Sequence, residues 1–227
     1  KPKSEAPQAS DGVELDTADV IGSQATKTGI YALEGADIFN LLVIPPYKKG
    51  QSVDPSVLSE AATYCQKRRA LLLINPPDSW TDKDKAKENF PISGLSSDNA
   101  AVYFPNVLMP NRLSDNQIEA FGPSGVIAGV IARTDATRGV WKAPAGTNAT
   151  LKGVVGLKVP LTDAENGELN PVGINCLRQM PAAGYVAWGA RTIQGDDRLA
   201  SQWKYIPVRR TALFIEESLY RGTQWAV

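Results

Sequence analysis

The chain has 227 residues, of which 43% are hydrophobic and 21% charged, and its 24 basic and 24 acidic residues give a formal net charge of zero. This length allows one large domain or two small ones, and nothing in the overall charge calls for nucleic acid or an anionic membrane as a partner. The chain contains no histidine, which removes the commonest general base and metal ligand and disfavours Ser-His-Asp, Cys-His and zinc chemistry.

The two cysteines, Cys65 and Cys176, lie in apolar runs far apart in the sequence. Buried free thiols are therefore favoured over a disulfide, which fits a reducing, intracellular place of assembly. No apolar run is long enough for a membrane-spanning helix, and no signal-peptide pattern is present. The chain begins with Lys1 rather than Met, so we expect a fragment or a processed product.

The first part of the chain differs in character from the rest. Residues 1–17 are polar, include Pro2 and Pro7, and show no periodic apolar pattern, so we expect a linker or a disordered end there. Residues 18–227 are expected to form one α/β core domain that is incomplete at its C-terminus.

Three short apolar runs, at residues 38–44, 70–74 and 100–104, are typical of strands covered on both faces. The segments between them predict helices. Asp54 and Pro55 mark the start of the first helix, and Ser79 or Thr81 is expected to cap a second, shorter one. This alternation predicts an α/β fold with a mostly parallel sheet and flanking helices.

The residues after the third strand are expected to be irregular as far as Gly122, because Pro105 and Pro110 interrupt them. A well-marked helix follows. Pro123 stands near its start, an apolar stripe at helical spacing predicts its buried face, and Gly139 marks its end. The stripe consists of Val126, Ile127, Val130 and Ile131.

The second half of the chain predicts further strands and one more long helix. Residues 154–160 are strand-like, and Thr162 with Glu165 forms a capping box for a short helix. Residues 173–178 and 185–188 read as two strands that pair in an antiparallel hairpin.

The last helix opens near Pro207, and its expected buried face repeats at 4, 3, 4 spacing. That face consists of Val208, Ala212, Ile215 and Leu219. Arg209 and Arg210 stand at the start of this helix and Glu216 and Glu217 near its end, which is opposite to the preference of the helix dipole. Either other parts of the chain or neighbouring subunits are expected to pair these charges.

The run PSGVIAGVIARTDATRGVWKAPAG, residues 123–146, is similar to the signature of contractile tail sheath proteins of bacteriophages and phage-derived injection devices. Four further segments resemble family text in the same order. They are LKGVVGL at 151–157, LTDAE at 161–165, LNPVGINC at 169–176 and WGART at 188–192. The resemblance covers residues 29–227 and is strongest from Pro123 onward.

This resemblance implies a structural subunit and not an enzyme. Subunits of this kind polymerise as a helical sheath around an inner tail tube and contract to drive the tube through the host cell envelope. The implied partners are other copies of the chain, the tube protein, the baseplate and the tail terminator, with no direct nucleic acid and no membrane insertion. The implied location is the virion tail, assembled in the cytoplasm of the bacterial host.

Charges within the family-matching segments are candidate subunit-interface residues. They are Arg133, Asp135, Arg138, Lys142, Arg191, Arg209, Arg210, Glu216 and Glu217. The alternative for two of them is local, because Asp135 and Arg138 at i, i+3 are spaced to pair on their own helix. No catalytic, cofactor-binding or metal-binding residue is predicted.

Two other functions stay open from the residues alone. One is an α/β enzyme or nucleotide-binding domain, since parallel sheets bind ligands at the carboxyl ends of their strands. Prolines at those ends, Pro45-Pro46 and Pro76-Pro77, supply no N–H for phosphate and count against it. The other is a different non-enzymatic tail component. Because the sheath resemblance implies terminal arms that this chain lacks, we expect the chain to be a truncated piece that is monomeric and forms no sheath alone.

Overall fold

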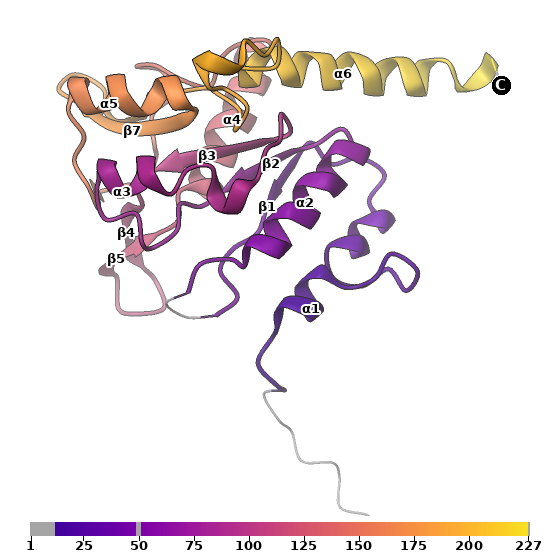
Figure 1. The fold of residues 1–227 in the computed structure, drawn as a ribbon, viewed down its shortest axis with the longest axis horizontal. Coiled ribbons are helices and arrows are strands. Elements are labelled where there is room, and N and C mark those ends of the chain that lie inside the picture. The colour runs from indigo at the N-terminus through magenta and orange to yellow at the C-terminus, as the bar shows by residue number, and fades with distance from the viewer. Residues whose placement is uncertain (1–11, 49–50, 227) are drawn as a thin grey trace, which may run out of the picture.

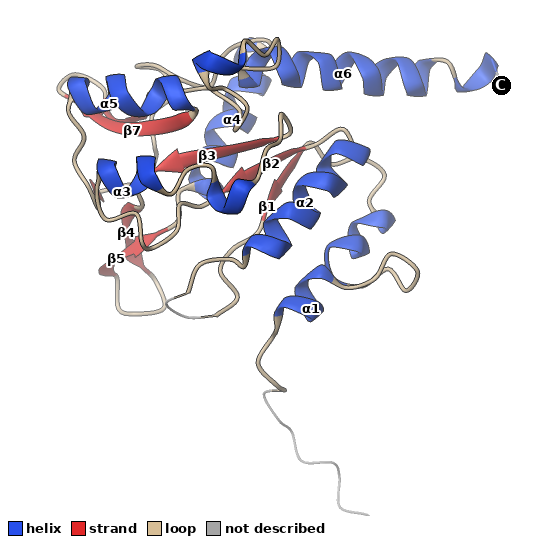
Figure 2. Cartoon of the chain, viewed as in Figure 1, coloured by secondary structure: helices blue, strands red, loops and turns tan. Residues whose placement is uncertain are grey.

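The computed structural model describes residues 12–48 and 51–226, so most of the expected linker at residues 1–17 lies outside the described residues. The fold is mixed α/β (Figures 1 and 2) and is centred on a five-stranded sheet in the order β1-β2-β3-β7-β8. The strands are β1 (Leu41–Val43), β2 (Leu71–Ile74), β3 (Ala100–Phe104), β7 (Ile174–Met180) and β8 (Gly184–Ala187). The first four are parallel and β8 pairs antiparallel with β7, which confirms the predicted class and the predicted hairpin.

Alternate residues of the central strands point into two separate apolar clusters, because successive side chains of a strand face opposite sides. Leu72 and Ile74 pack with the helix α2 (Pro55–Lys67) on one face. Leu71 and Leu73 pack with α4 (Ser124–Arg138) on the other. The sheet is thus covered on both faces, as the continuous apolar runs predict.

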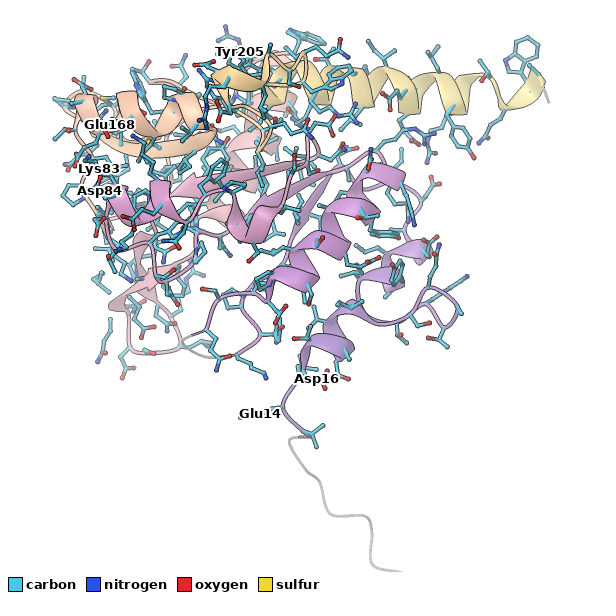
Figure 3. The ribbon with its side chains drawn as sticks, viewed as in Figure 1. Glu14, Asp16, Lys83, Asp84, Glu168 and Tyr205 are labelled. Carbon is cyan, nitrogen blue, oxygen red and sulfur yellow. The ribbon has the colours of Figure 1, made fainter. Side chains whose placement is uncertain are left out.

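The remaining helices surround this core. The helices α3 (Lys83–Glu88) and α5 (Asp163–Leu169) lie side by side on the α2 face, joined by an ion pair of 3.1 Å between Lys83 and Glu168 (Figure 3). The short helix α1 (Thr17–Ile21) packs near α2, and α6 (Ile206–Gly222) closes the chain. None of the described helices is long and apolar enough to cross a membrane.

Several predicted helix starts agree with the structure and one does not. Asp54 accepts a hydrogen bond from the Ser56 N–H and caps α2, and Thr162 with Glu165 forms the predicted capping box of α5. The helix α3, however, is capped by Asp82, whose carboxylate accepts from the Lys85 N–H at 2.9 Å. A carboxylate at this position is an equally good cap, and Thr81 instead donates its hydroxyl proton to Asp82.

The stretch predicted to be irregular forms a second, three-stranded antiparallel sheet in the order β5-β4-β6. Its strands are β4 (Val107–Asn111), β5 (Gln117–Phe121) and β6 (Gly156–Leu157). The prediction is wrong because Pro110 does not interrupt strand β4, in which it pairs with Ile118. In the structure β6 pairs only with Val107 and Leu108, so Pro110 lies beyond the end of that pairing, where the missing N–H costs little.

The helix α6 extends away from the body of the molecule (Figure 1), and its predicted buried face is wrong. Val208, Ile215 and Leu219 are 46%, 50% and 61% exposed, and Ala212 is only half-buried. The buried residues of α6 are instead Ile206, Arg209, Arg210 and Leu213. Spacing locates an apolar stripe but does not say what covers it, and here the stripe faces away from the sheet.

Candidate subunit interface

The start of α4 is held at the end of strand β2, where Asn75 accepts a hydrogen bond from the Ser124 N–H at 2.9 Å. Ile127, Val130 and Ile131 are then buried against the sheet, as predicted. These contacts fix the direction of α4 and bring Arg133, Asp135 and Arg138 to its C-terminal end.

The end of α4 is shaped by a glycine and a tryptophan. Gly139 has a φ of +92°, and a Cβ at this position would lie 2.3 Å from the ring of Trp141. Only glycine permits this backbone and this close approach. Trp141 is nevertheless 68% exposed, so its outer side is open to a partner.

Asp135 does not pair with Arg138, so the local alternative is wrong. Both carboxylate oxygens of Asp135 accept hydrogen bonds from Arg210, at 2.8 and 2.6 Å, in a bidentate pair between α4 and α6. The Arg210 side chain is almost fully buried. This pair binds the start of α6 to the body of the molecule.

Two other predicted interface arginines are also held within the chain. Arg209 is buried and donates to Asn99 Oδ1 at 2.8 Å, with Asp98 at 3.3 Å and Glu216 at 3.5 Å. Its guanidinium also lies over the ring of Trp203. These contacts make Arg209 part of the internal structure at the foot of α6.

Arg191 is buried and donates to Asn170, Gly195 and Asp197. Asp197 also receives a hydrogen bond from Lys204 at 2.6 Å. The hydrogen bond from Arg191, together with that from Lys204, lowers the pKa of Asp197 from 3.8 to about 2. This cluster fixes the loop between β8 and α6.

The outer half of α6 is tied to the body by ion pairs. Glu217 accepts from Arg69 at 3.0 Å and from Arg221 at 2.7 Å, and Arg221 in turn pairs with Asp37 at 2.9 Å. Charges that oppose the helix dipole are therefore paired inside the chain, which is the first of the two alternatives raised by the sequence. The side of α6 that faces the body carries the paired arginines together with Ile206 and Leu213, whereas Val208, Ile215 and Leu219 are exposed.

A groove of about 340 Å³ lies between the end of α4 and α6. Trp141 and Phe214, both more than half exposed, form its apolar sides, while the Arg210–Asp135 pair lies at its wall. A second exposed apolar feature is the outward stripe of α6, defined as Val208, Ile215 and Leu219. The sequence does not single out Phe214, because it lies off the periodic stripe of α6.

The three remaining predicted cations lie around a second hollow of about 270 Å³ beside the end of α4. We call it the cationic hollow and define it by Arg133, Arg138 and Lys142, with Ala143, Ala145 and Ala149 among its lining residues. Arg133 donates to the Thr150 carbonyl at 2.8 Å and Lys142 to the Ala143 carbonyl at 3.1 Å. Within residues 12–48 and 51–226 none of the three cations has a carboxylate partner.

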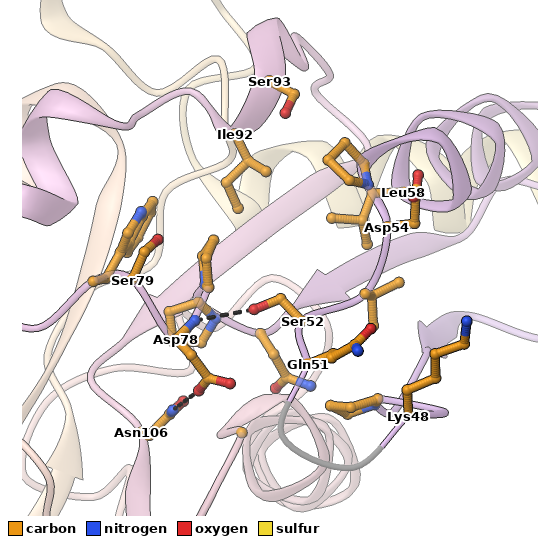
Figure 4. A pocket seen from close by; sticks show the side chains of 18 of the residues that line it. Lys48, Gln51, Ser52, Asp54, Leu58, Asp78, Ser79, Ile92, Ser93 and Asn106 are labelled. Atoms are coloured by element: carbon orange, nitrogen blue, oxygen red, sulfur yellow. Dashed lines mark hydrogen bonds between the residues drawn. The ribbon is translucent and has the colours of Figure 1, made fainter. Parts of the chain in front are cut away.

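The largest hollow, about 590 Å³, lies at the carboxyl ends of the parallel strands (Figure 4). Ser52 accepts from the Asp78 N–H at 3.0 Å, and Asn106 donates to the Asp78 carboxylate at 3.5 Å. The N-terminus of α2 opens here but is already capped by Asp54. Among the described residues no group of His, Cys, Asp and Glu is arranged to hold a metal ion.

Comparison with known proteins adds the family. The sequence model of the phage tail sheath protein central domain matches residues 19–193. A prophage major tail sheath protein of Pseudomonas aeruginosa (strain UCBPP-PA14) is 28% identical, over 97% of this chain and 56% of the relative.

Two solved contractile sheaths are similar in sequence and in fold. The contracted helical sheath of the anti-feeding prophage is 32% identical with a TM-score of 0.70, over 94% of this chain and 54% of that one. The contracted sheath complex of the extracellular contractile injection system PVC is 30% identical with a TM-score of 0.65, over 86% of this chain and 50% of that one. This chain spans about half the length of the relatives that it matches. With its strand order, its α4 signature and these matches together, the chain belongs to the phage tail sheath protein family.

Proposed function

We propose that this chain is the core of a structural subunit of a contractile tail sheath, which polymerises around the tail tube and contracts to drive the tube through the host cell envelope. The family match over residues 19–193 supports this, and the two solved relatives are sheaths in the contracted state. The proposed partners are other copies of the chain, the tube protein, the baseplate and the tail terminator. The proposed location is the tail, after assembly in the bacterial cytoplasm.

The observation that carries the proposal is the reversed polarity of α6. Its body-facing side is held by ion pairs, whereas Val208, Ile215 and Leu219 face outward. An isolated soluble domain gains nothing from this arrangement, because the hydrophobic effect favours apolar side chains turned inward. An assembled subunit gains from it, because the stripe becomes buried against another surface.

A sheath needs no bond chemistry. The work of contraction comes from many copies that exchange one set of contacts for another of lower free energy, each contributing a few kcal/mol. For this the subunit core must stay rigid while its surfaces change partners. The buried pairs Arg210–Asp135 and Arg209–Asp98 serve that rigidity, and we propose residues 18–227 as the rigid core.

The predicted interface residues therefore separate into two groups. Arg191, Arg209, Arg210, Asp135 and Glu217 have charged partners within the chain. Arg133, Arg138 and Lys142 have none, and Glu216 is half exposed with only a 3.5 Å contact to Arg209. We propose the second group for contacts between subunits.

The test is electron microscopy of the full-length protein expressed in bacteria. We expect the wild-type protein to form sheath tubes, and a full-length protein that never forms tubes contradicts the proposed function. We expect Arg138→Glu to reduce the number and length of the tubes. Normal assembly and contraction of that variant would remove Arg138 from the interface and leave the function intact.

The alternative of a nucleotide-binding domain has one observation in its favour, the 590 Å³ hollow at the carboxyl ends of the strands. Against it, Asp54 occupies the helix N-terminus where a phosphate would bind, and prolines line the strand ends. We expect no change in melting temperature with ATP, GTP or NAD. A clear stabilisation by one of them would revive this alternative.

A further inference from the structure

The cationic hollow brings together three cations that have no carboxylate partner among residues 12–48 and 51–226. Arginines elsewhere in the described chain form ion pairs with carboxylates, apart from Arg112 in a hairpin, whereas Arg133 and Arg138 do not. Lys142 adds a third positive charge to the same hollow. Three like charges in one place repel one another, so an acidic partner is favoured there.

The chain has a matching acidic segment far from the hollow. Residues 13–19 carry Glu14, Asp16 and Asp19, all exposed, and no cation pairs with them in the described part of the chain. In the cap of α1, the Asp16 carboxylate accepts a hydrogen bond from the Asp19 N–H, and the Asp19 carboxylate accepts one from the Asp16 N–H. The negative charges of this segment are therefore as uncompensated as the positive charges of the hollow.

The acidic segment also carries exposed apolar residues that match the alanines lining the cationic hollow. Val13 is 90% exposed and Leu15 52% exposed, and they alternate with Glu14 and Asp16. In an extended chain such alternation places the apolar side chains on one side and the carboxylates on the other. The cationic hollow offers a complementary surface, with alanine side chains in its lining and cations around them.

One copy cannot make this contact with itself. Figure 3 shows Glu14 and Asp16 below the body of the molecule, whereas the end of α4 approaches the first turn of α6 at the opposite side in Figure 1. A contact between different patches on two copies is heterologous, and it repeats from copy to copy into rings or helices instead of closing as a pair.

We propose that residues 13–19 of one subunit dock into the cationic hollow of a neighbouring subunit, with Glu14, Asp16 and Asp19 facing Arg133, Arg138 and Lys142. This inference rests on the proposed function, because it assigns one contact of the proposed sheath. The contact relies on exposed charges, so it is weak between isolated copies and weakens further as salt is added. It becomes effective when many subunits are held together.

The experiment is a charge swap in the 227-residue chain at high protein concentration and low salt. The hollow variant is Arg138→Glu with Lys142→Glu, and the segment variant is Glu14→Lys with Asp19→Lys. In the segment variant Asp16 still accepts from the N–H of residue 19, but the bond from the Asp16 N–H to the Asp19 carboxylate is lost, so circular dichroism verifies folding. Association is measured by sedimentation velocity, and contacts are identified by carbodiimide crosslinking of mixed unlabelled and 15N-labelled chains.

We expect wild-type chains to give intermolecular crosslinks between Lys142 and the carboxylates of residues 13–19. Each variant alone should lose these crosslinks and its association, whereas the equimolar mixture of the two variants should recover association, since each interface again joins opposite charges. The matched control, Lys152→Glu with Lys158→Glu, changes net charge equally but at exposed lysines outside the hollow. It should associate like the wild type.

Two results would overturn the inference. One is association of the hollow variant at the wild-type level. The other is equal recovery when the segment variant is mixed with the lysine control, which would indicate bulk charge attraction. Failure of the proposed function is a separate outcome, since it shows as an absence of sheath tubes from the full-length wild-type protein. Tubes from full-length protein carrying the hollow substitutions would refute the contact alone.

Discussion

The bidentate pair between Arg210 and Asp135 is the clearest single contact that holds α6 to the body. Arg210 is buried while Asp135 is partly exposed, so removal of Asp135 leaves a buried guanidinium that water reaches poorly. Breaking such a pair costs about 3 kcal/mol, whereas replacing both partners by apolar residues of similar size costs much less.

We therefore expect Asp135→Leu to lower the free energy of unfolding by about 3 kcal/mol, and Arg210→Met by less, because the carboxylate that it leaves is partly exposed. The double variant should be less destabilised than the sum of the two. Urea unfolding of all four proteins gives the coupling energy directly. Simple additivity would show that the pair contributes no net interaction and that α6 is held by Ile206 and Leu213 instead.

Asp197 makes the loop before α6 sensitive to acid. Its pKa is lowered from 3.8 to about 2 by the hydrogen bonds from Arg191 and Lys204. A carboxyl group with a depressed folded-state pKa contributes stability above its unfolded-state pKa, and that contribution is lost as the pH falls through the folded-state value.

We expect the difference in unfolding free energy between the wild type and Asp197→Asn to be constant at neutral pH and to shrink between about pH 4 and pH 2. Arg191 keeps its bonds to Asn170 and Gly195 in the variant, so the variant should fold. Denaturant titrations across this pH range make the comparison. A difference that persists unchanged at pH 2 would show that the Asp197 carboxylate is not the titrating group.

At the scale of elements, helix α6 shows that the spacing of its apolar residues does not determine which of them are buried. Leu213 is 4% exposed and packs inward, whereas Leu219 lies in the outward stripe and is mostly exposed. Both are leucines of the same helix, so they form a matched pair for substitution.

We expect Leu213→Ala to cost about 2–4 kcal/mol of stability, because it leaves a buried cavity. Leu219→Gln should change stability by less than about 0.5 kcal/mol in the isolated chain. The same Leu219→Gln change in the full-length protein should impair assembly, as counted by tubes in electron micrographs. If Leu219→Gln destabilises the isolated chain as strongly as Leu213→Ala, the stripe is buried within one copy and its interface role is wrong.

The elements differ in how well their residues predict them. Residues 71–74 are all apolar because both faces of β2 are covered. The sequence is therefore sufficient to predict this buried strand. The hairpin of β4 and β5 was not predictable, because most of its side chains contact solvent and leave no clear apolar pattern in the sequence. Likewise, the charges of α6 were visible, but their partners Asn99, Asp135 and Arg69 lie far away in sequence and only the fold brings them near.

The candidate site shows the same limit. Arg133, Arg138 and Lys142 were identified because charge coincides with the family signature, and the structure places them around one hollow. Sequence alone did not separate them from Arg191, Arg209 and Arg210, which carry the same charge and also lie within residues 29–227, the part of the chain that resembles the family. Burial and partners make that distinction, and both arise from tertiary contacts.

At the scale of the whole molecule, the cationic hollow and the outward stripe of α6 lead to an expectation about association. Bringing two copies together costs on the order of 4–15 kcal/mol in lost translational and rotational freedom. The cationic hollow supplies exposed ion pairs, typically worth less than about 1 kcal/mol each. The outward stripe adds only a few half-exposed apolar side chains, so neither surface alone offsets that cost.

We accordingly expect the 227-residue chain to be monomeric at micromolar concentration and to form no sheath tubes, with association detectable only at high concentration and low salt. Sedimentation velocity over a concentration series and negative-stain micrographs of the same samples make the measurement. Within an assembled sheath each subunit makes its contacts simultaneously, and the cost of bringing copies together is no longer met by one contact. Tubes formed by this chain alone would mean that the surfaces described here are sufficient for assembly, and that the weak-contact reading of the cationic hollow is wrong.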